Sequence, residues 1–202
     1  MLLSVKTRQK YLKELGYYTG EIDGKVGKLT KKAYADLQND YFTRKSDRDG
    51  KYGKDTDKLL RCAYNCRDLK HFKLTEFKCG CKTKYCTGYP VELDRNLLLN
   101  LDNMRKHYGK SMNVKSGTRC KKYNSTLKGS SPTSYHLKGK ACDFQMTGKC
   151  STLNGRKELV KYWSENYKTA RYSYCNGYGI KNGKVSYPKA NNMGWSVHVD
   201  VK

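Results

Sequence analysis

This sequence lacks long hydrophobic runs, and it has few acidic side chains for its number of basic ones. No stretch of the 202 residues approaches the roughly 20 apolar residues that a helix needs to cross a lipid bilayer, so we expect no membrane insertion. Residues 1–5 are too short for the apolar core of a secretory signal peptide, and no basic segment precedes them. We therefore expect synthesis in the cytoplasm without a secretion signal.

The shortage of acidic residues leaves a large positive charge. The chain has 42 Lys and Arg against 18 Asp and Glu, which gives a formal net charge of +24. A charge of this size needs an anionic partner or strong solvation. Nucleic acid, anionic lipid and anionic cell-wall polymer are the candidates, and charge alone does not choose between them.

Cysteine occurs in an odd number. In a cytosolic product these side chains are mostly thiols. Cys79-x-Cys81 together with Cys86 could hold a metal, but the spacing is not that of a zinc-finger pair and no fourth ligand is evident. We favour structural thiols, or one disulfide formed after release. The nine cysteines are Cys62, Cys66, Cys79, Cys81, Cys86, Cys120, Cys142, Cys150 and Cys175.

An internal repeat organises the first third of the chain. Residues 23–30 and 49–56 share Asp-Gly-Lys-x-Gly-Lys-x-Thr, six identical positions of eight, 26 residues apart. Asp-Gly supplies a tight turn, and Thr30 and Thr56 are expected to cap the helices that follow. With a third apolar stripe at helical spacing before the first repeat, the pattern predicts three short helices joined by two similar loops.

Two other interpretations of the repeat are weaker. Asp47-x-Asp49-Gly50 resembles part of a calcium loop, but Lys51 stands where an oxygen ligand belongs and no Glu closes the loop. A DNA-binding helix–turn–helix would suit the charge, yet it gives no reason for the doubled loop. We therefore expect no nucleic acid partner.

The first third of the chain contains the longer pattern Leu12-x-x-Leu15-Gly16-Tyr17-Tyr18-x-Gly20-x-Ile22-Asp23-Gly24-x-x-Gly27-x-x-Thr30-x-x-Ala33-x-x-x-Leu37-Gln38. This pattern resembles the three-helix peptidoglycan-binding domain over about residues 3–65. That resemblance implies recognition of wall sugar and stem peptide, without catalysis. We place this domain at residues 1–66, a polar linker at 67–71 and a second domain at 72–202.

Hydrophobic periodicity predicts an α+β second domain with a small antiparallel sheet. Residues 121–133, rich in Lys, Ser and Gly, are expected to form a loop. The predicted helices are 91–107 and 159–167, and the predicted strands are 113–117, 172–180, 184–187 and a half-buried strand within 195–202.

A candidate metal site lies in this second domain. His136 and Asp143 carry two good zinc ligands, and a catalytic zinc takes three protein ligands and a water. His198 and Asp200 are two apart in the last strand and so face the same side. We predict that His136, Asp143 and His198 bind zinc, with Asp200 beside the open position. The plainer alternative is a hydrogen-bonded core histidine and a chance His–Asp spacing.

The same residues resemble the M15 zinc peptidases, the D-alanyl-D-alanine carboxypeptidases and L-alanyl-D-glutamate endopeptidases of cell walls and phage lysins. The resemblance covers about residues 70–202 and implies the fold shared by hedgehog and D-Ala-D-Ala peptidases. Its motifs are Phe72-x-x-x-Glu76-Phe77-x-Cys79, Ser116-Gly117-Thr118-Arg119 with Thr118 in place of an aromatic residue, Ser134-x-His136-x-x-Gly139-x-Ala141-x-Asp143 and His198-Val199-Asp200-Val201.

The resemblance also suggests roles. The family often places its general base three residues before the last histidine, where this chain has Trp195. Asp200 is therefore our candidate base, with orientation of a ligand as its alternative role. Arg119 would stabilise an oxyanion or bind a substrate carboxylate. Ser134 and Trp195 are expected to contact the substrate.

Together these features predict a phage or prophage endolysin that is made in the host bacterial cytoplasm and acts at the wall after release. Its partners would be peptidoglycan and, through the basic surface, anionic wall polymers. We expect an L-alanyl-D-glutamate endopeptidase. A D-alanyl-D-alanine carboxypeptidase and a non-catalytic wall-binding protein are the alternatives.

Overall fold

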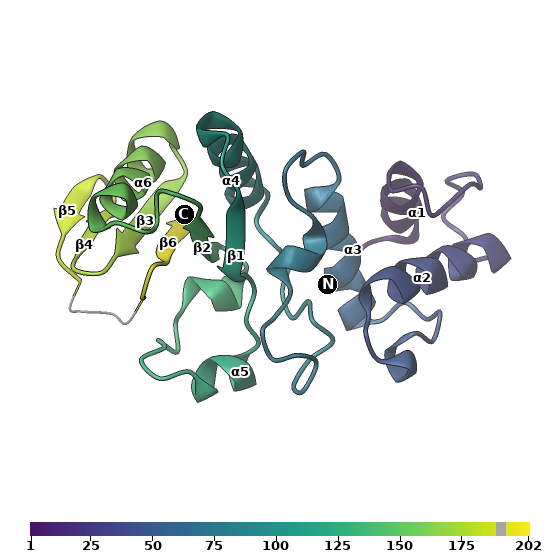
Figure 1. The fold of residues 1–202 in the computed structure, drawn as a ribbon. Coiled ribbons are helices and arrows are strands. Elements are labelled where there is room, and N and C mark those ends of the chain that lie inside the picture. Colours follow the sequence, from purple (N-terminus) through teal and green to yellow (C-terminus); the bar gives the residue numbers. More distant parts are fainter. Residues whose placement is uncertain (189–192) are drawn as a thin grey trace.

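The computed structural model describes residues 1–188 and 193–202. Three helices come first, and a mixed region with a six-stranded antiparallel sheet follows (Figure 1). The expected α+β class, with a helical N-terminal domain and a small antiparallel sheet, is confirmed. Among the described helices, none is both long and apolar enough to span a membrane.

The N-terminal domain consists of α1 (Val5–Glu14), α2 (Lys28–Tyr41) and α3 (Lys54–Cys66), with a short 3-10 turn, η1 (Lys45–Asp47), between the last two. Each helix turns one apolar side inward, as the spacing predicted. Their fully or almost fully buried side chains are Leu12, Ala33, Tyr34, Leu37, Leu59, Leu60, Cys62 and Ala63.

Each repeated loop closes around one buried glutamine from the preceding helix. Gln38 donates through Nε2 to the Asp49 carboxylate at 3.2 Å and to the Lys51 carbonyl at 2.9 Å. Its Oε1 accepts from the Gly50 N–H at 2.7 Å. Gln9 makes the equivalent three contacts with the first loop. The aspartates of the repeat therefore serve to shape the loops.

The expected caps were wrong. The N-caps of α2 and α3 are Gly27 and Gly53, and neither helix has a side-chain cap bond. Thr30 and Thr56 lie inside the first turn and are buried, and each hydroxyl donates across its loop to a lysine carbonyl at 3.3 Å. The threonines tie the loop to the helix because their burial places them against the loop backbone.

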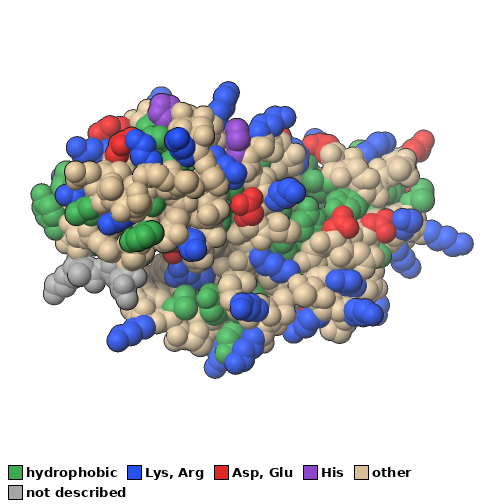
Figure 2. Space-filling view, viewed as in Figure 1, with side chains coloured by type: hydrophobic (Ala, Val, Ile, Leu, Met, Phe, Trp, Pro, Cys, Tyr) green, Lys and Arg blue, Asp and Glu red, His purple; other side chains and the backbone are tan. Residues whose placement is uncertain are grey.

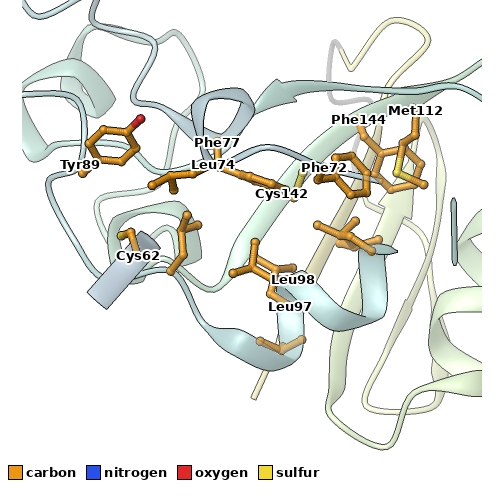
Figure 3. Close-up of a cluster of buried hydrophobic side chains, with 14 of the residues drawn as sticks. Cys62, Phe72, Leu74, Phe77, Tyr89, Leu97, Leu98, Met112, Cys142 and Phe144 are labelled. Atoms are coloured by element: carbon orange, nitrogen blue, oxygen red, sulfur yellow. The ribbon is translucent and has the colours of Figure 1, made fainter. Parts of the chain in front are cut away.

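The segment between the two parts is bonded to its surroundings. The N–H groups of Lys70 and His71 donate to the Asp102 carboxylate at 3.2 and 2.7 Å. Asn65, at the end of α3, donates to the Leu93 carbonyl at 2.8 Å. Hydrophobic side chains from both parts form one cluster, in which Cys62 lies near Tyr89 and Leu74 (Figure 3). The boundaries at 66 and 72 stay a prediction, because the core runs across them.

The sheet has the order β1-β2-β6-β3-β4-β5, with every neighbouring pair antiparallel. The C-terminal strand therefore lies inside the sheet, where both its edges are paired. The strands are β1 (Met112–Ser116), β2 (Ala141–Met146), β3 (Ala170–Cys175), β4 (Tyr178–Lys181), β5 (Lys184–Ser186) and β6 (Val197–Val201).

Helices and short turns complete this domain. Asp94 caps α4, since its carboxylate accepts from the N–H groups of Asn96 and Leu97 at 2.9 and 3.2 Å. α6 lies against β3, β4 and β6. The elements are η2 (Leu74–Phe77), α4 (Arg95–Tyr108), α5 (Lys121–Thr126), η3 (Tyr135–Lys138) and α6 (Leu153–Asn166).

Three local predictions needed correction. The loop expected at 121–133 contains the helix α5, and the strand expected at 172–180 is the hairpin of β3 and β4, which turns at Gly177 with a φ of 72°. The last strand is not half-buried, because all five residues of β6 are buried. Its polar side chains are covered by neighbours that the alternation pattern could not reveal.

Candidate metal centre

The three predicted ligands come together from three elements. His136 lies on η3, Asp143 on β2 and His198 on β6, and the register pairs the last two directly across the strands. Their ligand atoms all lie within 4.8 Å of one another. His198 Nδ1 is 2.7 Å from Asp143 Oδ1, and His136 Nε2 is 3.2 Å from Asp143 Oδ2. All three residues are buried.

The outer nitrogen of each imidazole faces an acceptor. His136 Nδ1 is 2.7 Å from the Gly117 carbonyl, and His198 Nε2 is 3.2 Å from Asp200 Oδ2. A proton donated to each acceptor leaves His136 Nε2 and His198 Nδ1 as lone pairs aimed at the same point. Ligating histidines are held in this way in metal sites. Two imidazole nitrogens and one carboxylate oxygen fit a zinc ion.

Glycine makes the turn between the first two ligands possible. η3 ends at Gly139, which has a φ of 68°. A Cβ built there would lie 1.9 Å from the Glu92 carbonyl oxygen. Only glycine combines this left-handed conformation with so close a backbone neighbour. The glycine of the motif thus lets the chain turn from His136 into the strand of Asp143.

Burial and mutual contact shift the ionisation of the three ligands. Burial lowers the pKa of His136 against the opposing pull of Asp143. Burial would raise the pKa of Asp143, but both histidines outweigh it and hold that pKa far below its usual value. For His198, bonds to Asp143 and Asp200 overcome burial and raise the pKa to about 9. A bound dication would displace that histidine proton.

Arg119 is bound to a predicted ligand. Its Nη2 is 2.6 Å from Asp143 Oδ2, and its Nε donates to Ser116 Oγ at 2.8 Å. The guanidinium therefore borders the centre, as the motif suggested, and its role toward a substrate stays a prediction. Ser134 is half-buried at the start of η3, and Trp195 is 63% exposed in the turn before β6. Their contact with substrate also stays a prediction.

Asp200 is bound on several sides. Its Oδ1 accepts from Arg171 Nε and from the Tyr172 N–H, both at 2.9 Å, and its Oδ2 pairs with Arg171 Nη2 and approaches His198 Nε2. Only 1% of the residue is exposed. It lies on the edge of the His198 ring opposite the one that faces Asp143. A carboxylate in this position can orient the His198 ring, which is the alternative role that we considered for Asp200.

Sequence reasoning missed two contributors from β3. Arg171 neutralises Asp200 and lies over the Tyr135 ring, 3.7 Å from its centroid. Tyr174 stacks on His198 with ring centroids 4.5 Å apart. Tyr174 also stands opposite His198 in the strand register. The alternation of side chains along β3 indicates which residues share a face, but it does not indicate which strand pairs with β3.

Comparison with known families agrees with both halves of the chain. The model for Peptidase M15 matches residues 70–182, more than half of the chain, and that for a putative peptidoglycan binding domain matches residues 3–60. The first match includes His136 and Asp143 and ends before His198. No curated protein matches the chain. The chain therefore belongs to the Peptidase M15 family, as a peptidoglycan-acting metallopeptidase with a peptidoglycan-binding domain at its N-terminus.

Proposed function

We propose that the protein is a zinc-dependent endolysin, an L-alanyl-D-glutamate endopeptidase that cuts the stem peptide of bacterial peptidoglycan. The observation that carries this proposal is the buried group of His136, Asp143 and His198, with each imidazole held by its outer nitrogen. When bound there, zinc would keep one position for water, bring the pKa of that water close to neutrality and polarise the scissile carbonyl.

The residues around the ligands then have separate tasks. Gly117 and Asp200 hold the two imidazoles in the orientation that presents a lone pair. Arg119 orients Asp143, and its contacts among the described residues use Nη2 and Nε. Its Nη1 is therefore available to donate to the oxygen that becomes negative as the peptide bond is attacked. We propose that Ser134 and Trp195 contact the peptide.

For Asp200 we propose orientation of His198 rather than acceptance of the water's proton. The Arg171 guanidinium and the Tyr172 N–H already donate to its oxygens and hold the carboxylate against the outer nitrogen of His198. The ring of His198 also separates it from Asp143. Measurements on an Asp200→Asn variant can distinguish this role from that of a general base.

The N-terminal domain would keep the enzyme on its polymer. A pocket of about 490 Å³ opens beside the second repeated loop, and we propose that it receives wall sugar and stem peptide. Tethering of this kind raises the local concentration of enzyme without any change at the catalytic centre. The pocket is lined by Arg8, Val26, Lys31, Tyr34, Asp49, Gly50, Lys51 and Tyr52.

The basic surface supports a second wall contact. Lys and Arg side chains are scattered over the face in Figure 2 and are not confined to one patch. A dispersed positive charge suits a flexible anionic wall polymer. None of the nine cysteines, all of which lie in the described residues, forms a disulfide, which favours synthesis in a reducing cytoplasm. We propose that a phage or prophage encodes the protein and that it reaches the wall after release.

Mass spectrometry of peptidoglycan fragments tests this function. Purified sacculi digested with the full chain should yield fragments cut between L-alanine and D-glutamate, and a chelator should stop their release. Loss of terminal D-alanine alone would instead identify a carboxypeptidase. Binding to sacculi without any cleavage would identify a wall-binding protein with an inactive peptidase domain.

A further inference from the structure

A second group of metal-ligand side chains lies outside the centre described above. Cys79, Cys81 and Cys86 belong to the loop after η2, and Cys120 is the N-cap residue of α5. Their four sulfur atoms all lie within 4.8 Å of one another. The fold thus supplies the fourth ligand that the spacing of the first three did not reveal.

The sulfur positions fit a tetrahedral ion better than a disulfide. Zinc bound to four thiolates at about 2.3 Å places neighbouring sulfurs about 3.8 Å apart. Cys81 Sγ and Cys86 Sγ are 3.5 Å apart, well beyond the length of about 2.05 Å that a disulfide requires. A single disulfide would also leave the other two sulfurs of the cluster without a partner.

Backbone donors point at the sulfurs. The Cys120 N–H donates to Cys79 Sγ at 3.4 Å, and the Tyr123 N–H donates to Cys120 Sγ at 3.4 Å. Such bonds stabilise thiolates and fix ligand orientation. The loop that carries three of the cysteines is also basic, with Lys78, Lys82 and Lys84. Positive charge on this loop suits the two net negative charges of a dication held by four thiolates.

The loop itself adopts a conformation that needs external support. Lys82 and Thr83 have φ values of 51° and 66°, in the left-handed region that side-chain-bearing residues rarely adopt. This turn lets Cys81 and Cys86 face each other. Two consecutive residues of this kind persist only where surrounding contacts hold them. Ligation at Cys79, Cys81 and Cys86 would supply that support.

We propose that Cys79, Cys81, Cys86 and Cys120 bind one structural zinc ion. Four thiolates fill the tetrahedron and leave no position for water, so the ion has no catalytic role. This site does not depend on the function proposed above.

The ion would fasten three parts of the molecule together. Cys120 follows the segment that carries Gly117 and Arg119 into the catalytic centre, and the Arg119 N–H donates to the His136 carbonyl at 3.1 Å. On the other side, Arg44 of the N-terminal domain donates to the Thr83 carbonyl at 3.3 Å. We therefore expect loss of this ion to loosen the support of the catalytic centre.

Zinc content per chain tests the proposal on the full-length protein. We expect two zinc ions in the wild type, one in a Cys81→Ser/Cys86→Ser variant and one in His136→Ala. Cys66→Ser, which changes a half-buried cysteine outside the cluster, should keep two. A wild type with one zinc that His136→Ala removes would overturn the proposal. One zinc that His136→Ala keeps and the double variant loses would support it, even if the proposed catalytic centre failed.

A second measurement needs no cysteine variant to fold. His136→Ala loaded with cobalt(II) should show the charge-transfer absorption of thiolate–cobalt bonds. In the same protein, four cysteines should resist alkylation until a chelator is added, and peptide mass spectrometry should identify them as the cluster. Absence of the absorption band, equal labelling with and without chelator, or a disulfide-linked pair would each refute the proposed zinc site.

Discussion

The His-Asp-His group and the four-cysteine group each bring their ligand atoms within 4.8 Å of one another, but different kinds of structure build them. Two of the three ligands in the first stand on neighbouring strands, whose register sets them opposite each other. The second draws three ligands from one loop and the fourth from the start of a short helix. On our proposals, the group built on the sheet would leave one metal position open for water, and the group built on loops would be closed and would hold those loops together. The number of ligands, and the elements that carry them, would thus distinguish a catalytic metal site from a structural one.

Removal of a ligand from the open site should have the largest effect. We expect His136→Ala to lose the zinc of that centre and all measurable hydrolysis of sacculi, while circular dichroism stays that of a folded protein. The matched control is His107→Ala, an exposed histidine at the end of α4, which should keep full activity. Full occupancy of two zinc ions in His136→Ala would refute the ligand assignment.

Loss of Arg119 should affect rate more than metal. Arg119→Ala removes the donor that we place at the developing negative charge, and such a loss costs about 10²–10³ in kcat. The zinc content should stay at two per chain, because Arg119 touches a ligand and is not one. A fall in metal content that parallels the fall in rate would instead assign Arg119 to the support of Asp143 alone.

Asp200→Asn should separate positioning from proton transfer. If Asp200 orients His198, zinc affinity at the open site should fall about 10- to 100-fold, and saturating zinc should restore most of the turnover. If Asp200 accepts the water's proton, zinc should stay bound and the turnover should be lost. A zinc titration and a turnover rate measured at saturating zinc decide between the two roles. Normal zinc affinity together with a normal rate would exclude both.

Removal of the Tyr174 ring, which stacks on His198, should have the smallest effect of the four substitutions. An aromatic pair contributes about 0.5–1.5 kcal/mol, so Tyr174→Leu should weaken zinc binding at the open site by about tenfold or less. The cysteine-bound ion should not respond. Tyr187→Leu, at a residue 80% exposed, is the control and should bind zinc as the wild type does. An equal loss at both metal sites would indicate general destabilisation.

Local sequence patterns predicted many of the helices and strands. The doubled Asp-Gly-Lys-x-Gly-Lys-x-Thr predicted three helices and two loops, and all of these are present. It did not reveal that Gln9 and Gln38 would fill the loops, because the two glutamines are 29 residues apart and lie outside the 26-residue repeat. Caps were mistaken for the same reason, since the burial of Thr30 depends on the helix packed beside it.

The sequence by itself determined which three residues are the candidate ligands of the open site, because a strand has a period of two and the glycine-containing motif sets a short path from His136 to Asp143. Only the tertiary structure decided what surrounds them. Arg171 reaches Asp200 because β3 pairs with β6, and Cys120 reaches the other cysteines because α5 begins beside the loop after η2. Both contacts join segments about 30 to 40 residues apart in the chain. Contacts of that range depend on strand order and packing, which no local pattern contains.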